Sequence, residues 1–224
     1  MGKLILVRHG KTVLNSLDSA ERLRGWMDIP LDEQGLQEAE ETAQRLSQYR
    51  VEHIYSSDLY RAQQTAGAVA KATRAPIVPT FDLRPWNVGT LAGQRVKDIL
   101  PILRQLELDP SLPAPEGESF LQFCDRYSRK LKELLDLAHQ SKSHIVAVTH
   151  VRNLLAAPTL LRGGDKGRIP VSGGPKTGSL VWVEKKGKGW NLRVDEAPEP
   201  SPAMSRKGKT EPAFTLNFPG LAEI

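Results

Sequence analysis

The stretch KLILVRHGKT, residues 3–12, decides the fold that this sequence predicts. Its first half, residues 3–7, is a short run of leucine and β-branched residues that ends at the polar pair Arg8 and His9. Such a run is typical of a buried strand in a parallel sheet that leads into a functional loop. We therefore predict that residues 3–7 form the central strand of a sheet and that His9 projects from its carboxyl end.

Strands and helices alternate along the rest of the chain. Hydrophobic periodicity predicts further strands at 53–55, 76–80 and 144–149, and a terminal hairpin at 179–184 and 190–194. It predicts a helix at 32–49 with Asp32 as its N-cap, and a second helix that begins after a cap at Ser57 or Asp58. Two further helices are predicted at 94–106 and at 119–139. This alternation predicts an α/β fold, a three-layer α/β/α sandwich with a mostly parallel central sheet.

One catalytic domain over residues 1–196 accounts for most of the 224 residues. Residues 197–210 are rich in proline, serine and basic residues, which is typical of a flexible linker. We therefore predict a C-terminal tail at 197–224. Within it the segment FTLNFP, residues 214–219, regains apolar character, as in segments that dock on the body or on a partner.

Composition is that of an ordinary soluble protein, with 39% hydrophobic and 25% charged residues. The net charge of +5 suits anionic partners, but the basic residues are scattered and lack interleaved aromatics, which argues against nucleic acid. The single Cys124 cannot form an intramolecular disulfide and fits a reducing compartment. No segment approaches the ~20 apolar residues of a membrane span. We predict a cytoplasmic protein with no nucleic-acid or membrane partner.

Two histidines reach the same edge of the predicted sheet by independent routes. His9 follows the first strand, His150 follows the strand at 144–149, and Arg61 lies in the first turns of a helix that comes after a strand. Ligands of open α/β sheets bind beyond the carboxyl ends of the strands. These three side chains are therefore expected to converge on one crevice.

The residue types in this crevice suit a phosphoryl group. A neutral imidazole nitrogen of His9 can attack phosphorus, and Arg8 can hold two phosphate oxygens through its planar fork. Gly10 removes a side chain where the phosphate must approach, and Thr12 and Asn15 can supply further donors.

Two other interpretations of the same residues are open. An isolated Arg-His-Gly tripeptide more often simply closes a strand. A metal site on His9 and His150 is the other, but no carboxylate lies at ligand spacing and the adjacent arginines disfavour a cation. Two arginines and two histidines around one point repel one another unless a dianion such as phosphate binds there, so we predict a phosphate pocket without metal.

Several ordered motifs resemble the histidine phosphatase superfamily, the branch that also contains the cofactor-dependent phosphoglycerate mutases. The likeness covers most of residues 3–195. It is carried by RHGKT at 8–12 with Asn15, GWMDIPL at 25–31, YSSDLYRAQQTA at 55–66, PEGES at 115–119 with Arg126, and Thr149-His150.

The resemblance implies a phosphoglycerate mutase-like fold and a phosphoric monoester hydrolase of the histidine acid phosphatase type. It implies that His9 becomes phosphorylated, that Arg8, Arg61 and His150 bind the phosphoryl oxygens, and that Asn15 belongs to the pocket. A small phosphorylated substrate and no metal or organic cofactor are expected. The oligomeric state stays open, with a dimer as one option.

The sequence departs from the family at the general acid. The family loop reads Leu-Arg-Glu-x-x-x-Gly, and its glutamate protonates the leaving oxygen, whereas residues 83–89 read LRPWNVG and place Pro85 there. Such protonation typically contributes ~10² to 10⁴ in rate. Asp82 is our candidate replacement, with a solvated loop aspartate as the alternative, and Glu118 is a weaker candidate because its position also fits N-capping.

Further departures lie at Lys11, Val151 and Arg152, where relatives often carry an acid or amide at the first position and glycine at the second. They favour a strongly anionic substrate. A phosphatase is the leading hypothesis. A catalytically weak phospholigand-binding protein is the alternative raised by Pro85, and a mutase is disfavoured because no Glu-Arg-His-Tyr segment occurs near residues 85–95.

Overall fold

The computed structural model describes residues 1–15, 22–170, 173–187 and 189–197. Its sheet has six strands in the order β3-β2-β4-β1-β5-β6, so the first strand is central, as predicted. The first four in this order pair in parallel, whereas β5 runs antiparallel to β1 and forms a hairpin with β6. The strands are β1 (Leu4–Arg8), β2 (Val51–Ser57), β3 (Ile77–Thr80), β4 (His144–Thr149), β5 (Leu180–Lys186) and β6 (Gly189–Asp195).

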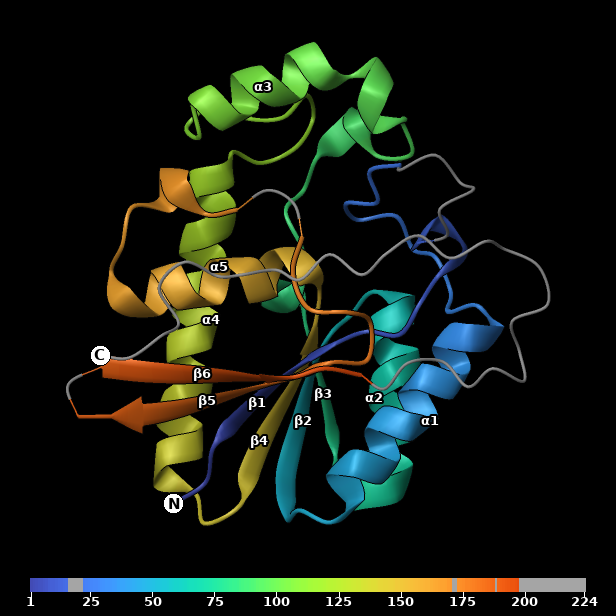
Figure 1. The fold of residues 1–224 in the computed structure, drawn as a ribbon, viewed down its shortest axis with the longest axis vertical. Coiled ribbons are helices and arrows are strands. Elements are labelled where there is room, and N and C mark those ends of the chain that lie inside the picture. The colour runs from blue at the N-terminus through green and yellow to red at the C-terminus, as the bar shows by residue number, and fades with distance from the viewer. Residues whose placement is uncertain (16–21, 171–172, 188, 198–224) are drawn as a thin grey trace.

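Helices cover both faces of the sheet (Figure 1). They are α1 (Glu33–Ser47), α2 (Tyr60–Thr73), α3 (Leu100–Leu108), α4 (Phe120–Gln140) and α5 (Val151–Arg162). Along β1, Ile5 and Val7 pack with α1 and α2, while Leu4 and Leu6 pack with α4 and α5. This alternation follows from the two-residue period of a strand, and it confirms the predicted three-layer sandwich.

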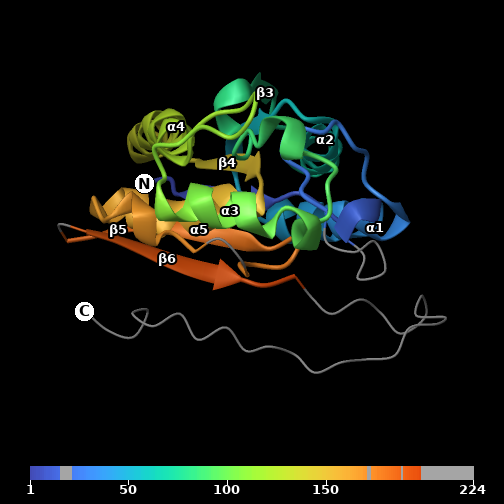
Figure 2. The ribbon, with the colours of Figure 1, turned by 90° about the horizontal axis from the view of Figure 1, so that it is seen from above.

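The helix α3 stands apart from these layers. It lies beyond the carboxyl ends of the parallel strands in Figure 1 and over the sheet when the molecule is seen from above in Figure 2. A helix was predicted at 94–106, but the structure has a 3₁₀ turn at Val96–Asp98 and starts α3 at Leu100. Pro101 in the first turn explains the late start, because proline is favoured there and disfavoured deeper in a helix.

Capping side chains fix where two of the helices begin. Asp32 accepts a hydrogen bond from the Gly35 amide at the start of α1, as predicted. Ser119 and Gln122 form a reciprocal capping box at the start of α4. The cap predicted for α2 at Ser57 or Asp58 is wrong, because the N-cap position is Leu59 and has no side-chain bond.

The helix α5 was not predicted at all. It begins at the residue after His150 and contains Pro158, so no turn residue marks its start and an internal proline interrupts its pattern. None of the helices in the described part of the chain is long and apolar enough to cross a membrane. The tail predicted at 197–224, with its segment 214–219, lies outside the described residues apart from Ala197.

Candidate active site

The strand pairing of β1 with β4 brings the two histidines together. Arg8 lies opposite Thr149 in the parallel register, and the His9 amide donates to the Thr149 carbonyl at 3.1 Å. The next residue of each strand is therefore a histidine at the same edge of the sheet. The centroids of the His9 and His150 rings are 5.0 Å apart, with the planes at 60°.

A cavity of about 100 Å³ opens at these rings. Both histidines line it, together with four arginines, Arg8, Arg24, Arg61 and Arg152. Pro85, Trp86 and Val151 contribute an apolar wall. No carboxylate is among the described residues that line it, so the cavity is strongly cationic.

The hydrogen bond of His9 fixes which ring nitrogen can react. Its Nδ1 lies 2.7 Å from the Gly10 carbonyl, and a carbonyl only accepts, so Nδ1 carries the proton and Nε2 keeps its lone pair. The side chain is buried, and burial, followed by the charges of Arg61 and Arg8, holds its pKa well below 6.5. The imidazole is therefore neutral at physiological pH.

His150 is oriented by Ser57. The Ser57 Oγ lies 2.9 Å from His150 Nε2 and accepts a hydrogen bond from the Leu59 amide at 3.4 Å. When the Ser57 hydroxyl donates its proton to Nε2, the imidazole proton of His150 lies on Nδ1. Burial, followed by the charge of Arg61, keeps the pKa of His150 well below 6.5. Sequence analysis named Ser57 only as a possible helix cap and not as a site residue, although Ser57 ends a strand just as His9 and His150 follow theirs.

The two predicted arginines are held by backbone carbonyls. Arg61, 1% exposed, donates from Nη1 to Met27 at 2.7 Å and from Nη2 to Gly25 at 3.2 Å. Arg8 donates from Nη1 to Pro175 at 2.5 Å. Burial first, and then the charge of Arg24, lowers the pKa of both guanidiniums to about 10. Both stay charged at neutral pH.

Three buried polar atoms of this site have no hydrogen-bond partner among the described residues. They are Arg8 Nε, Arg61 Nε and His150 Nδ1. An unsatisfied buried donor costs roughly 1–3 kcal/mol and calls for an explanation. All three residues line the cavity, so an oxyanion bound there is one explanation for these unpartnered atoms.

Sequence reasoning missed Arg24, which lines the cavity and whose charge lowers the pKa of Arg8, Arg61 and both histidines. It lies immediately before the segment GWMDIPL at 25–31, and that adjacency was the available signal.

The chain matches the model of the histidine phosphatase superfamily (branch 1) over residues 4–196. It belongs to the histidine phosphatase superfamily. It is similar to the "Probable phosphoglycerate mutase GpmB" of Yersinia pestis, with 35% identity over 152 residues that cover 66% of this chain and 69% of the relative.

Solved structures share the fold over most of the chain. A mycobacterial glucosyl-3-phosphoglycerate phosphatase in complex with VO3 has 25% identity and a TM-score of 0.74, covering 88% of this chain and 100% of that one. Bacillus stearothermophilus YhfR also has 25% identity and a TM-score of 0.74, covering 89% and 98%.

In this member of the histidine phosphatase superfamily, Gly10 is required for packing. A Cβ on Gly10 would lie 2.3 Å from the Gly35 carbonyl oxygen at the start of α1, so the close approach is to the backbone of α1. The sequence-based reason, access for phosphate, stays a prediction beside this packing requirement. The Gly10 amide also donates to Thr65 Oγ1 at 3.1 Å.

Thr12 and Asn15 hold the loop after His9. The Thr12 amide and hydroxyl both donate to Asn15 Oδ1, at 3.0 and 2.8 Å. Neither residue lines the cavity, so direct contact with a substrate stays a prediction for both. Lys11 does not line it either, and its Nζ donates to Gln34, so the part of Lys11 in favouring an anionic substrate stays a prediction.

An apolar residue occupies the position where the resemblance places the family's general acid. Pro85 lines the cavity, and its carbonyl accepts from Trp26 Nε1 at 2.8 Å. Asp82 lies in a 3₁₀ turn at Phe81–Leu83 and does not line the cavity, so its role as the acid stays a prediction. Glu118 binds Arg126 at 2.6 Å and accepts from the Asn87 amide, which assigns its carboxylate to holding this loop.

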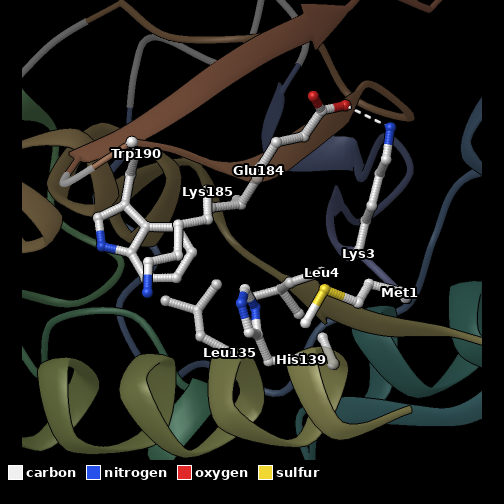
Figure 3. A pocket seen from close by; sticks show the side chains of 12 residues that line it. Met1, Lys3, Leu4, Leu135, His139, Glu184, Lys185 and Trp190 are labelled. Atoms are coloured by element: carbon white, nitrogen blue, oxygen red, sulfur yellow. Dashed lines mark hydrogen bonds and ion pairs between the residues drawn. The ribbon is translucent and has the colours of Figure 1, made fainter. Parts of the chain in front are cut away.

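A larger cavity of about 410 Å³ lies at the opposite end of β1 (Figure 3). Met1, Leu4 and Trp190 line it beside the ion pair of Lys3 with Glu184 at 2.7 Å. None of the predicted site residues belongs to it, so its size does not mark it as the reaction centre.

Proposed function

We propose that this chain is a metal-independent phosphatase that hydrolyses a small phosphomonoester through a phosphohistidine on His9. One observation carries the proposal: the His9 Nδ1 proton is committed to the Gly10 carbonyl, which leaves Nε2 as the nucleophile. That nucleophile is buried, neutral and surrounded by guanidiniums. The pairing of a neutral nucleophile with fixed cations suits attack on a phosphate dianion.

The proposed first step forms a bond between His9 Nε2 and phosphorus while the ester bond to the leaving oxygen breaks. Charge on the equatorial oxygens is stabilised by Arg8, by Arg61 and by the Nδ1 proton of His150. In the second step water attacks phosphorus, inorganic phosphate leaves, and His9 Nε2 regains its lone pair. Ser57 acts as a positioning residue through His150.

Protonation of the leaving oxygen has no carboxylate assigned to it among the described lining residues. Leaving groups that depart as stable anions, such as nitrophenolate, are therefore expected to be favoured over alkoxides. The prediction that Asp82 supplies the proton is tested by Asp82→Asn, since unchanged hydrolysis of an alkyl phosphate would exclude it.

Names of similar proteins support phosphoryl transfer without choosing the acceptor. The Yersinia relative is named a mutase, and the mycobacterial protein is a phosphatase solved with the oxyanion VO3. A mutase would return the phosphoryl group from His9 to a substrate hydroxyl and release little inorganic phosphate. The ratio of free phosphate to isomerised substrate separates these outcomes.

The direct test is hydrolysis of p-nitrophenyl phosphate between pH 4 and 8 with a chelator present. We expect chelator-resistant activity in the wild type and its loss in His9→Ala. His53→Ala, at a partly exposed histidine that does not line the cavity, is the matched control and should keep wild-type activity. Activity that disappears with chelator, or that survives in His9→Ala, contradicts the proposal. No turnover at any pH would favour the phospholigand-binding alternative.

A further inference from the structure

The guanidinium of Arg61 is held by a turn whose third residue is Trp26. The Met27 amide closes this turn by donating to the Arg24 carbonyl at 2.9 Å, and Gly25 within it has a φ of 45°. The Met27 carbonyl accepts from Arg61 Nη1 at 2.7 Å, and the Gly25 carbonyl accepts from Nη2 at 3.2 Å. The position of the turn therefore sets where the guanidinium lies.

The two hydrogen bonds also set the direction of the third guanidinium nitrogen, because the group is planar and rigid. That nitrogen, Arg61 Nε, is buried and has no hydrogen-bond partner among the described residues. Arg61 lines the cavity together with both histidines. A displacement of the turn would therefore redirect the Nε–H group that is available to an oxyanion in the cavity.

The side chain of Trp26 attaches the turn to the loop at 81–85. Its Nε1 donates to the Pro85 carbonyl at 2.8 Å, and its ring lies edge-on to Phe81, with the centroids 5.0 Å apart and the planes at 78°. The guanidinium of Arg84 lies 5.0 Å from the centroid of the Trp26 ring, and an indole attracts a cation more strongly than other aromatic rings do. Trp26 is not among the residues that line the cavity, so it can affect a ligand only through its neighbours.

The loop at 81–85 is itself firmly held. Arg126, a buried side chain, donates from Nη1 to the carbonyls of Asp82 at 3.1 Å and of Arg84 at 3.2 Å. The guanidinium of Arg84 in turn forms two hydrogen bonds with the carboxylate of Asp58, at 2.7 and 2.8 Å. The loop is therefore a rigid support against which Trp26 places the turn.

We propose that Trp26 is a positioning residue for Arg61. By joining the turn to the loop at 81–85, it keeps the carbonyls of Gly25 and Met27 where they hold the guanidinium in the orientation that a bound phosphoryl group requires. The inference rests on the proposed function of the same cavity, and it adds to that function a residue that does not line the cavity.

The test is a double-mutant cycle on the binding of inorganic phosphate, measured by calorimetry. Arg61→Lys provides the second background, because lysine keeps the charge but lacks the planar fork. We expect Trp26→Leu to weaken phosphate binding about tenfold in the wild-type background and by less than about twofold in Arg61→Lys, since residues that act through one another are not additive. The same fold-change in both backgrounds, or an unchanged affinity in Trp26→Leu alone, would overturn the inference.

Two further variants control for the fold and for the loss of a tryptophan. Trp26→Phe keeps a ring but loses the hydrogen bond to Pro85, so it should weaken binding less than Trp26→Leu does. It also replaces Trp26→Leu in the cycle if thermal unfolding shows that Trp26→Leu does not fold. Trp190→Leu is the matched control, because Trp190 is also partly buried but lines the cavity at the opposite end of β1. It should leave the affinity for phosphate at the wild-type value.

Failure of the proposed function is recognised separately, because the cycle needs no turnover. Coupling between Trp26 and Arg61 in a chain that hydrolyses no phosphomonoester supports the inference and contradicts the proposed function. Equal effects in the two backgrounds of an active phosphatase overturn the inference and leave the proposed function intact.

Discussion

The chemistry of this molecule is set at the residue scale by where the protons of two histidines lie. His9 donates a hydrogen bond from Nδ1 to the carbonyl of its neighbour Gly10. His150 is instead hydrogen-bonded to Ser57 through Nε2. In the proposed reaction the same residue type therefore acts as the nucleophile at one position and as a hydrogen-bond donor at the other. Burial and two guanidiniums keep His9 neutral, so its lone pair is available without a general base.

This electrostatic arrangement makes stability depend on pH. Because the pKa of His9 and of His150 is lowered in the fold, the unfolded chain binds more protons below pH 6.5 than the folded chain does. The free energy of unfolding should therefore fall on acidification below 6.5, by up to about 1.4 kcal/mol per pH unit for each histidine. Urea unfolding between pH 7 and 5 measures the slope. His9→Gln and His150→Gln should each flatten it, and an unchanged slope in both would contradict this account.

Pro85 gives a second prediction at this scale. It lines the cavity at the position where the family places its acid, so Pro85→Glu should raise kcat/KM for an alkyl phosphate. We expect a rise of about tenfold to 10²-fold, at or below the lower end of the 10²- to 10⁴-fold that a general acid typically contributes. Pro85→Gln serves as control, because the glutamine side chain has nearly the shape of glutamate but carries no acidic proton. Equal values for the two variants would show that the position does not reach the leaving oxygen.

Which residues could be found from the sequence depended on whether they follow strands. Arg8, His9 and His150 follow predicted strands, and a parallel sheet necessarily brings such residues to one edge. Arg24 comes from a connecting segment, whose path is set by tertiary packing rather than by local pattern. Gly10 was recognised, but its partner Gly35 lies 25 positions away, so the reason for the glycine required the structure.

At the scale of elements, the loop after β1 is clamped against the start of α1 by a close backbone approach. A Cβ on Gly35 would lie 1.9 Å from the Lys11 carbonyl oxygen. Gly35→Ala must therefore displace the loop that carries His9, and we expect it to destabilise the fold by roughly 1–3 kcal/mol, as for other overpacked sites. Chemical denaturation measures this.

Gly67→Ala is the matched control, because it lies within α2 and an added Cβ meets nothing within 4 Å. It should stabilise the protein slightly, by up to about 1 kcal/mol, since alanine is the better helix former. Equal effects at the two positions would mean that the clamp is not a constraint.

Helix ends were the elements that sequence analysis predicted least well. Asp58 was expected to cap α2, but it forms a bidentate pair with Arg84, at 2.7 and 2.8 Å, and that pair also lowers the pKa of Asp58. A local preference was thus overridden by a partner 26 positions away, which no local pattern contains. The cap at Asp32 was predicted, and its partner Gly35 lies only three residues on; the cap at Ser119 was not predicted, although its partner Gln122 lies equally near.

At the scale of the whole molecule, the end of the described chain is attached near the site. Glu196 accepts from the Lys176 amide at 3.0 Å and from Ser179 Oγ at 2.7 Å. Pro175, the residue before Lys176, provides the carbonyl that accepts the hydrogen bond of Arg8. The boundary predicted at residue 196 therefore falls on a contact that supports the cavity.

A chain ending at Ala197 should consequently keep the thermal stability and kcat/KM of the full chain, whereas one ending at Asp195 should lose affinity for phosphate. Differential scanning calorimetry and inhibition by inorganic phosphate measure the two effects. If the two truncations behave alike, the Glu196 contact does not support the site. If both lose activity, the residues beyond 197 contribute to it.

The measurement that tests the central claim most directly is rapid quenching during turnover of a ³²P-labelled aryl phosphate, with the labelled residue mapped by mass spectrometry. The account predicts acid-labile, base-stable label on His9, attached to Nε2 because Nδ1 is bonded to the Gly10 carbonyl, and none in His9→Ala. Hydrolysis that proceeds with no label on the protein, or with label on any other residue, would contradict it.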